Sequence, residues 1–203
     1  MKYIIMCGSN HQYINGIPRQ LVTIKDERIL DRTIRLLRDC GVTDIAVTSL
    51  DRNFEDCGVE VIRYNSHGPW VCCFLPRSEP TCYIFGDVYF SYKAIETIVR
   101  TQTDDIEFFA SAPPFSPEYS KPWGEPFAFK VVDQGRFRKA IEKVKEMREQ
   151  NQFNREPIAW ELWQVIKGTP INQIDYTNYT VINDYTCDVD CEADVINIER
   201  KLS

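Results

Sequence analysis

The feature that most constrains the fold is an apolar strand, Tyr3–Met6, that runs directly into a small polar loop. The loop reads Cys7-Gly8-Ser9-Asn10-His11. In open α/β sheets, a strand that ends in such a loop presents backbone N–H groups to phosphates at the carboxyl edge of the sheet. The loop is therefore the first place to look for a binding site.

Length and charge narrow the class of protein. A chain of 203 residues is long enough to bury a proper core and suits one domain. Its net charge of −6 argues against nucleic acid as the main partner, because binding a phosphate backbone needs a concentrated excess of Lys and Arg. No apolar run approaches the roughly 20 residues that span a bilayer, and the N-terminus lacks the layout of a signal peptide. We expect a cytoplasmic protein without a membrane partner.

The eight cysteines favour packing over chemistry. Most of them lie among apolar neighbours, and no pair has the C-x-x-C spacing of a zinc or redox site. Cys187 and Cys191 are separated by three residues and flanked by acids, and only two histidines could join them at a metal. We expect reduced, structural thiols.

Short apolar runs alternate with helical patterns along the rest of the chain. Strand, helix and strand at the start imply a parallel crossover. The expected strands are 3–6, 45–48, 59–62, 82–85, 108–110 and 127–132, with a strand-rich stretch over 171–182. The expected helices carry apolar stripes at 29–37, 95–99, 137–147 and 160–166, and a last helix starts near Glu192. Prolines between 113 and 122 predict an irregular loop. The pattern predicts a single α/β domain over 1–203 with a mixed sheet.

Two groups of carboxylates stand out. Asp87 follows a buried strand, where open α/β folds collect ligands, although Gly86-Asp87 is also ordinary turn composition. Asp188 and Asp190 alternate in an extended stretch, so they share one face. Mg²⁺ takes one or two such carboxylates together with substrate phosphate oxygens. Asp194 is better explained as a residue that starts a helix.

Several motifs together resemble a known superfamily. In the first half of the chain they are the segment from Tyr3 to Gly8, Pro18-Arg19-Gln20-Leu21, and the segment from Leu30 to Ile45. Further on they are Gly86-Asp87-Val88-Tyr89-Phe90, and Asp188-Val189-Asp190 followed by Glu192-Ala193-Asp194. In this order they resemble the sugar nucleotidyltransferase superfamily. The resemblance covers nearly the whole chain. It implies an α/β, Rossmann-like fold whose mixed, mostly parallel central sheet is flanked by helices, the nucleotide-diphospho-sugar transferase or GT-A-like fold.

The resemblance also implies an activity and a site. The activity is transfer of a nucleoside monophosphate from a nucleoside triphosphate to a phosphorylated sugar or other small phosphate, with release of pyrophosphate. It implies Mg²⁺ on Asp87 and Asp190, with Arg19 as a catalytic cation. Lys130 is the candidate for a second cation, and a strand-edge lysine is the alternative. The expected nucleotide-binding residues are Met6, Cys7, Gly8, Ser9, Asn10, His11, Ser66, Gly86 and Asp87.

An acceptor-binding part is expected over residues 112–182. Trp123, Glu125, Trp160 and Glu161 offer aromatic faces and carboxylates, which suit sugar rings, hydroxyls or a cationic acceptor, although core packing also explains such tryptophans.

The first loop departs from the superfamily pattern. Asn10 and Gln12 stand where its members usually carry glycine and arginine, and Arg19 replaces a lysine, which keeps the charge and adds a planar fork. Two other functions therefore stay open. Asp188 and Asp190 have the spacing of a glycosyltransferase that uses a nucleotide sugar, and the altered loop suits a nucleotide-binding protein without catalysis. The sequence leaves the base and the acceptor open, and self-association of the chain is compatible with it.

Overall fold

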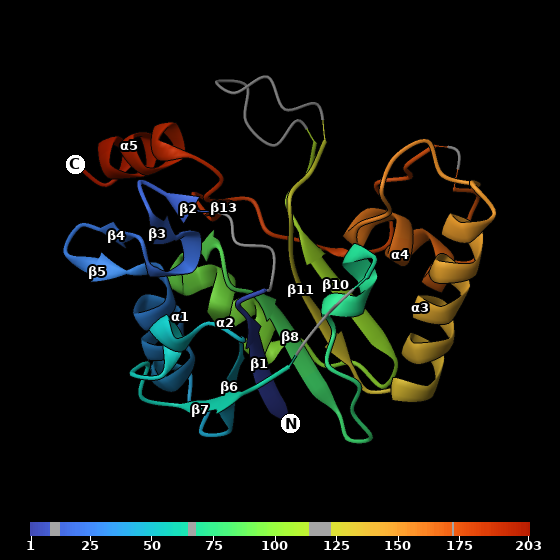
Figure 1. Ribbon diagram of the computed structural model, residues 1–203, viewed down its shortest axis with the longest axis horizontal. Helices are drawn as coiled ribbons and strands as arrows, with labels where there is room; N and C mark the ends of the chain where they lie inside the picture. Colours follow the sequence, from blue (N-terminus) through green and yellow to red (C-terminus); the bar gives the residue numbers. More distant parts are fainter. Residues whose placement is uncertain (9–12, 65–67, 114–122, 172) are drawn as a thin grey trace.

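A seven-stranded mixed sheet runs through the protein in the order β12-β10-β11-β8-β1-β6-β7 (Figure 1). The computed structural model describes residues 1–8, 13–64, 68–113, 123–171 and 173–203. β1, β6, β7 and β8 are mutually parallel, whereas β11 runs antiparallel to both of its neighbours. The strands are β1 (Lys2–Met6), β6 (Ile45–Thr48), β7 (Glu60–Ile62), β8 (Thr81–Phe85), β10 (Ile106–Ala110), β11 (Pro126–Val131) and β12 (Thr180–Val181). The predicted fold class, a mostly parallel sheet flanked by helices, is confirmed.

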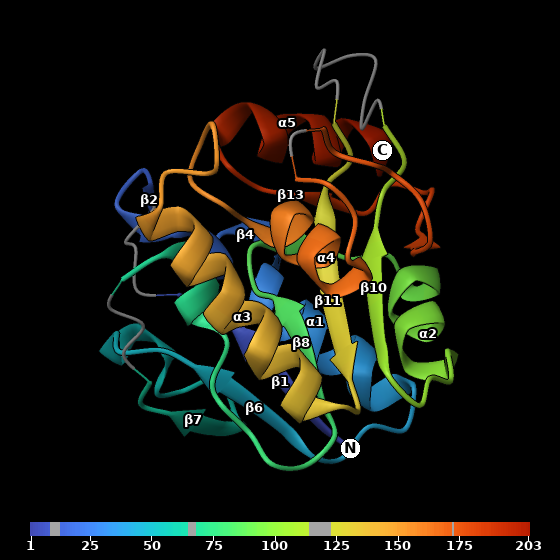
Figure 2. The same cartoon turned by 90° about the vertical axis from the view of Figure 1, so that its right-hand side faces the viewer.

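Helices cover both faces of this sheet (Figures 1 and 2). α1 (Ile29–Asp39) and α2 (Tyr92–Arg100) pack together on one face, and α3 (Gln134–Glu149) and α4 (Ala159–Lys167) on the other. Two residues suited to helix ends limit α2 and α1: Ser91 Oγ accepts a hydrogen bond from the Ala94 N–H at 2.9 Å, and Gly41 follows α1 with a φ of 85°. In the described part of the chain, no helix is long and apolar enough to cross a bilayer.

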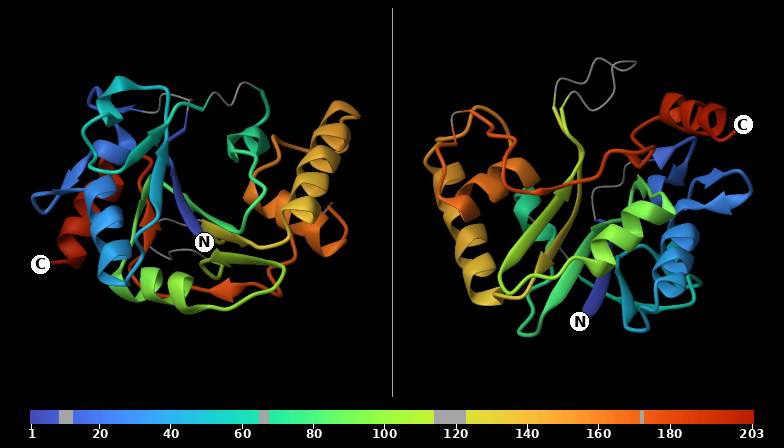
Figure 3. Two further views of the ribbon diagram at one scale, coloured as in Figure 1. Left: turned by 90° about the horizontal axis from the view of Figure 1, so that it is seen from below. Right: turned by 180° about the vertical axis from the view of Figure 1, so that it is seen from behind.

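The order of the strands reverses beside β1. The chain moves outward from β1 through α1 to β6 and β7, and then returns to place β8 on the other side of β1 (Figure 3). Open α/β sheets form a crevice at the carboxyl ends of strands where the direction of winding reverses. Met6 and Phe85 are the paired last residues of β1 and β8, so they mark this point.

The main core is aromatic on the face that α3 and α4 cover. The ring of Phe74 packs edge-on against Tyr83, Phe129 and Phe137, with centroids 5.1 to 5.6 Å apart. Phe108 stacks on Phe129 with ring centroids 4.4 Å apart. Edge-to-face and offset pairs add to the free energy of burying large rings. This packing fixes the sheet floor from which the site residues project.

A smaller core lies under the C-terminal helix, α5 (Glu192–Lys201). It joins α5 to two hairpins, β2 (Tyr13–Ile14) with β3 (Ile17–Pro18), and β4 (Thr23–Ile24) with β5 (Glu27–Arg28). Ile24, Val189 and Ile198 are buried within it. The predicted start of the last helix near Glu192 is confirmed, whereas the two hairpins were not predicted.

A two-residue ladder ties the C-terminal segment to the centre of the molecule. β13 (Cys187–Asp188) pairs antiparallel with β9 (Val88–Tyr89), which directly follows β8. The Val189 N–H continues the ladder by donating to the Asp87 carbonyl at 2.8 Å. The acidic residues near the C-terminus are thereby placed next to Asp87.

The predicted strand-rich stretch over 171–182 is wrong. Among its described residues, only β12 (Thr180–Val181) is a strand. The buried side chain of Gln164 explains this difference, because its amide donates to the carbonyls of Pro170 and Gln173 while its Oε1 accepts from the Asp175 N–H. These backbone groups are hydrogen-bonded to the side chain of one glutamine on α4, so they do not have to pair with a neighbouring strand.

The approach of β8 to β1 leaves no room for a side chain at residue 86. A Cβ there would lie 2.6 Å from the Met6 carbonyl oxygen and 2.8 Å from Cys7 Sγ. We expect Gly86→Ala to lower the free energy of unfolding by about 1–3 kcal/mol, because overpacking forces the backbone apart. Urea denaturation measures this. Gly8→Ala is the control, since no other described residue beyond its chain neighbours has an atom within 4 Å of its Cβ position. Equal losses for both variants would contradict the prediction.

Candidate functional site

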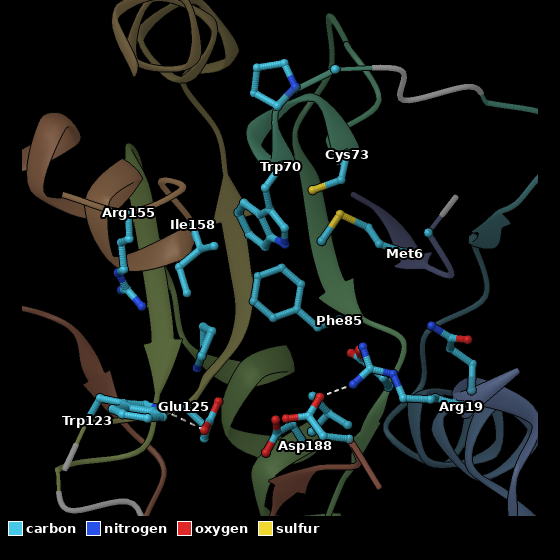
Figure 4. A pocket seen from close by; sticks show the side chains of 18 residues that line it. Met6, Arg19, Trp70, Cys73, Phe85, Trp123, Glu125, Arg155, Ile158 and Asp188 are labelled. Carbon is cyan, nitrogen blue, oxygen red and sulfur yellow. Dashed lines mark hydrogen bonds and ion pairs between the residues drawn. The ribbon is translucent and has the colours of Figure 1, made fainter. Parts of the chain in front are cut away.

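A pocket of about 490 Å³ opens at the carboxyl ends of β1 and β8, where the sheet reverses its winding (Figure 4). Its floor comes from Phe85 at the end of β8, and its walls come from segments that are distant in the sequence. The lining residues are Met6, Gly8, Arg19, Gln20, Gly68, Pro69, Trp70, Cys73, Phe85, Asp87, Val88, Trp123, Glu125, Pro126, Arg155, Ile158, Asp188 and Asp190. The pocket therefore lies where open α/β folds bind ligands.

One side of the pocket is acidic and carries a single arginine. Asp87, Asp188 and Asp190 line it together, because β9 and β13 are paired. The Arg19 guanidinium bridges two of these acids: Nη2 lies 3.3 Å from Asp87 Oδ2, and Nη1 donates to Asp190 Oδ1. Its side chain is only 10% exposed, whereas those of Asp87 and Asp190 are 28% and 52% exposed. The arginine is thus the most enclosed member of the group.

The local chain conformation explains how Arg19 reaches this place. Pro18 ends β3, and the single 3-10 turn Arg19–Leu21 follows it. The Val22 N–H closes the turn by donating to the Arg19 carbonyl at 3.2 Å, while Leu21 is buried in the main core. The turn is anchored on its apolar side, so the arginine side chain points into the pocket, as Figure 4 shows.

The opposite side of the pocket combines aromatic and charged groups (Figure 4). The Trp123 indole N–H donates to Glu125 Oε1 at 3.1 Å. Glu125 is held in turn by two hydrogen bonds with Ser111: its N–H donates to Ser111 Oγ at 2.7 Å, and its carbonyl accepts from the Ser111 N–H at 2.8 Å. Gly124, between Trp123 and Glu125, has no room for a side chain, because a Cβ would lie 2.2 Å from the Ser111 carbonyl oxygen. This wall is rigidly attached to the end of β10.

Arg155 completes that wall and was not identified from the sequence. Its Nε donates to Glu161 Oε1 at 2.8 Å, and Glu161 Oε2 accepts from the Ile158 N–H at 3.0 Å. Glu161, whose side chain is 5% exposed, therefore both caps α4 and orients the arginine. No motif surrounds Arg155, and the one available signal is the acidic residue six positions later.

The segment before β8 also reaches the pocket, where Gly68, Pro69 and Trp70 contribute to the lining. Trp70 begins a 3-10 turn, Trp70–Cys73, and its ring packs edge-on against Phe85 with centroids 5.7 Å apart. Ser66, predicted to bind nucleotide, lies outside the described residues.

The predicted nucleotide-binding residues of the first loop are only partly described. Met6 and Gly8 line the pocket with Asp87, whereas Cys7 and Gly86 pack behind it. The Cys7 N–H donates to the Thr48 carbonyl at 3.0 Å, and burial raises the pKa of its thiol well above the ordinary value. Ser9, Asn10, His11 and Gln12 lie outside the described residues.

Three predicted site residues lie away from the pocket lining. Lys130 is buried in β11 and its ammonium donates to the carbonyls of Val99 and Thr101, at 3.0 and 2.7 Å, where it closes the C-terminal end of α2. Trp160 is 1% exposed in the core and donates to the Gly124 carbonyl at 2.7 Å. Glu161 acts through Arg155 and the α4 cap. None of these three side chains is among the residues that line this pocket, and these hydrogen bonds account for their positions.

Solved structures resemble the chain along its whole length, although no protein-family model and no curated protein sequence matches it. A protein from Bacillus anthracis, described as a glucose-1-phosphate thymidylyltransferase in complex with sucrose, has a TM-score of 0.60 at 13% identity, and the match covers 99% of this chain and 94% of that one. HddC from Yersinia pseudotuberculosis, complexed with GMP-PN, has a TM-score of 0.52 at 15% identity over 100% and 99% of the two chains. Rv0371c from Mycobacterium tuberculosis H37Rv has a TM-score of 0.57 at 13% identity over 98% and 97%.

The chain has the sugar nucleotidyltransferase fold. The topological reversal beside β1 and the pocket at that point agree with this architecture. The fold by itself assigns no substrate, because one fold hosts many functions, so the function must be argued from the site.

Asp87, Asp188 and Asp190 form the acidic wall of the pocket, and their side chains fit the chemistry of Mg²⁺. Within the described residues, no group of three His, Cys, Asp or Glu side chains forms a complete metal cage. Mg²⁺ does not require one, since it keeps several waters and uses one or two carboxylates with phosphate oxygens. Asp87 and Asp190, which one guanidinium now joins, are such a pair of hard oxygen donors at the mouth of a pocket.

The environment of Lys130 predicts a pH dependence of stability. Burial lowers the pKa of its ammonium below the ordinary value of 10.5. Between the folded and unfolded pKa values the unfolded chain binds more protons, so stability rises with pH in that window. We expect the free energy of unfolding of the wild type, relative to Lys130→Met, to grow as the pH rises through the lowered pKa of Lys130 towards 10.5. Urea denaturation under reducing conditions measures it, and a constant difference would contradict the assignment.

Proposed function

We propose that the chain is a Mg²⁺-dependent nucleotidyltransferase that transfers a nucleoside monophosphate from a nucleoside triphosphate to a phosphorylated sugar or another small phosphate. One observation carries the proposal: Asp87 and Asp190, distant in sequence, meet around Arg19 at the reversal point of a nucleotidyltransferase fold. A divalent cation and an arginine on one side of a pocket are what a triphosphate requires.

The reaction asks for positioning and neutralisation of charge. An oxygen of the acceptor phosphate attacks the α-phosphorus, a new P–O bond forms, and the bond to the β-phosphate breaks with release of pyrophosphate. Asp87 and Asp190 would hold Mg²⁺, which supplies positive charge to the phosphate oxygens when it is bound. Because the acceptor phosphate is already an anionic nucleophile, the chain's main tasks are to orient both substrates and to offset their charge.

The two sides of the pocket suit the two substrates. Met6, Gly8 and Arg19 lie beside the acids and would take the triphosphate, with the Arg19 N–H groups as donors to phosphate oxygens. Trp123, Glu125 and Arg155 face them across the pocket and would take the acceptor (Figure 4). An indole face, a carboxylate and a guanidinium suit a sugar ring, its hydroxyls and its phosphate, respectively. The sucrose and GMP-PN complexes of two structural neighbours are consistent with a sugar and a nucleotide as ligands.

A second candidate function is transfer of a sugar from a nucleotide-sugar donor. Asp188 and Asp190 favour it, because both line the pocket at the spacing of an Asp-x-Asp metal motif. Nucleotide binding without catalysis is the third outcome to be tested. A cytoplasmic location and self-association stay predictions from the sequence.

One assay separates these functions. The protein is incubated with Mg²⁺, each of the four common nucleoside triphosphates, and a panel of sugar phosphates and amino-alcohol phosphates, and pyrophosphate is measured. Parallel reactions with nucleotide sugars measure release of nucleoside diphosphate. Pyrophosphate that depends on an acceptor supports nucleotidyl transfer. Release of nucleoside diphosphate alone identifies a glycosyltransferase, and nucleotide binding without either product leaves a binding protein.

The paired acids predict a loss of turnover. We expect Asp87→Asn and Asp190→Asn each to lower kcat by roughly 10²–10³, because an amide neither holds Mg²⁺ as well nor offsets its charge. Asp44→Asn is the matched control, since Asp44 forms an exposed ion pair with Lys2 at the far end of β1. Circular dichroism checks folding. Turnover of either variant within the range of the control would remove that aspartate from the site.

Arg155 is expected to act on the acceptor alone. Arg155→Gln should raise KM for the phosphorylated acceptor roughly tenfold or more and leave KM for the nucleotide unchanged, since a charge-assisted hydrogen bond to phosphate is lost. Steady-state kinetics with each substrate varied in turn measures the two constants. Arg136→Gln, which removes an exposed arginine paired with Asp105, is the control. Equal changes in both constants would contradict a role confined to the acceptor.

A further inference from the structure

Arg19 lies between the two carboxylates that the proposed function assigns to a cation. Its Nη1 and Nη2 each contact a different aspartate. The guanidinium therefore bridges the two carboxylates and does not form a bidentate pair with either of them. No other cationic side chain lines this side of the pocket within the described residues. The group therefore combines two negative charges with one positive charge that is part of the chain.

The burial of these three side chains shows which of them depends on the others. Arg19 is 10% exposed, while Asp190 keeps half of its exposure and Asp87 more than a quarter. A buried guanidinium needs its anions far more than exposed carboxylates need their cation. Its Nε is also buried and has no hydrogen-bond partner among the described residues. Arg19 is thus held in the pocket by the same oxygens that would bind a metal ion.

We propose that Arg19 is an internal counter-ion that competes with divalent cations for Asp87 and Asp190, so that a metal ion binds in exchange for the guanidinium. The proposal rests on the proposed function only for the identity of the incoming ion. The exchange keeps a cation in contact with both acids before and after metal binding. It also releases the two terminal nitrogens of Arg19, which then donate to the oxygens of a phosphate group that arrives with the metal.

Such an exchange orders the binding events. A metal ion alone must displace the guanidinium without giving it a new anion, which weakens its binding. A metal ion bound to a nucleotide brings phosphate oxygens for Arg19, so the same displacement leaves the arginine paired. The acidic wall should consequently accept the metal–nucleotide complex in preference to the free ion.

The test is the affinity for Mn²⁺ alone, measured by isothermal titration calorimetry and by electron paramagnetic resonance, with no nucleotide present. We expect Arg19→Gln to bind Mn²⁺ about tenfold or more tightly than the wild type, because removing a cation that contacts both ligands ends the competition. Arg155→Gln is the matched control. It removes one positive charge from the same pocket, but that charge is paired with Glu161 and not with the aspartates. Asp87→Asn should weaken Mn²⁺ binding both in the wild type and in the Arg19→Gln variant.

A thermal melt gives a second readout that needs no activity. In EDTA, Arg19→Gln should melt below the wild type, because Asp87 and Asp190 then lose the cation that bridges them. Added Mn²⁺ should raise its Tm more than that of the wild type, in line with its tighter binding. If Arg19→Gln does not fold, Arg19→Lys serves in its place, since a single compact ammonium cannot contact both acids as a fork does and should compete less well.

Equal or weaker Mn²⁺ binding by the Arg19 variants, or an equal gain in the Arg155 variant, would overturn the proposal. Its outcome is independent of the proposed function. Tighter Mn²⁺ binding without pyrophosphate release in the assay would support the exchange and reject nucleotidyl transfer. Pyrophosphate release with unchanged Mn²⁺ affinity would support the enzyme and reject the exchange.

Discussion

The short ladder between β9 and β13 is the contact on which the site depends. It is only two residue pairs long, yet it brings the C-terminal acids to the carboxyl end of β8. The hydrogen bond from the Val189 N–H to the Asp87 carbonyl extends it, and the fully buried Val189 side chain anchors it in the smaller core beneath α5. Helix α5 and the N-terminal hairpins therefore contribute to the acidic wall although they do not line it. Without this ladder, Arg19 would have one of its two anions and the pocket would lack a side.

Much of the fold could be predicted because its central elements carry strong local signals. The apolar runs of β1, β6 and β8 and the stripes of α1 and α2 match the structure to within a few residues, and Ser91 and Gly41 mark helix ends as their chemistry requires. The hairpins β2–β5 and the β9–β13 ladder were missed because strands of two residues have no periodicity to detect. The stretch after α4 was overpredicted, since the apolar residues there suggested strands while the Gln164 side chain satisfies the backbone.

Site residues could be predicted where a sequence motif marks them. They could not be predicted where only contacts between distant elements bring them to the pocket. Asp87 and Asp190 were identified by their motifs, and the structure brings them together. Lys130 offered the right charge, but alternation along β11 directs it towards the end of α2. Arg155 lacks any motif and is oriented only by Glu161, six residues away and across a turn. Propensity and spacing describe single elements, whereas such placements arise from contacts between elements.

The Ser111–Glu125 hydrogen bonds affect which parts of the pocket can tolerate sequence changes during evolution. They join the two points at which the chain leaves and re-enters the sheet, so Glu125 is tied to the ends of β10 and β11, and the Trp123 indole is hydrogen-bonded to Glu125. Changes of chain length between Ser111 and Trp123 therefore need not move Glu125, which these hydrogen bonds tie to the sheet. The side that carries Arg19 belongs to a different set of strands and does not share this freedom. Selection could thus reshape the choice of acceptor while the phosphate side stays fixed, which makes the two halves of the pocket separable units of divergence.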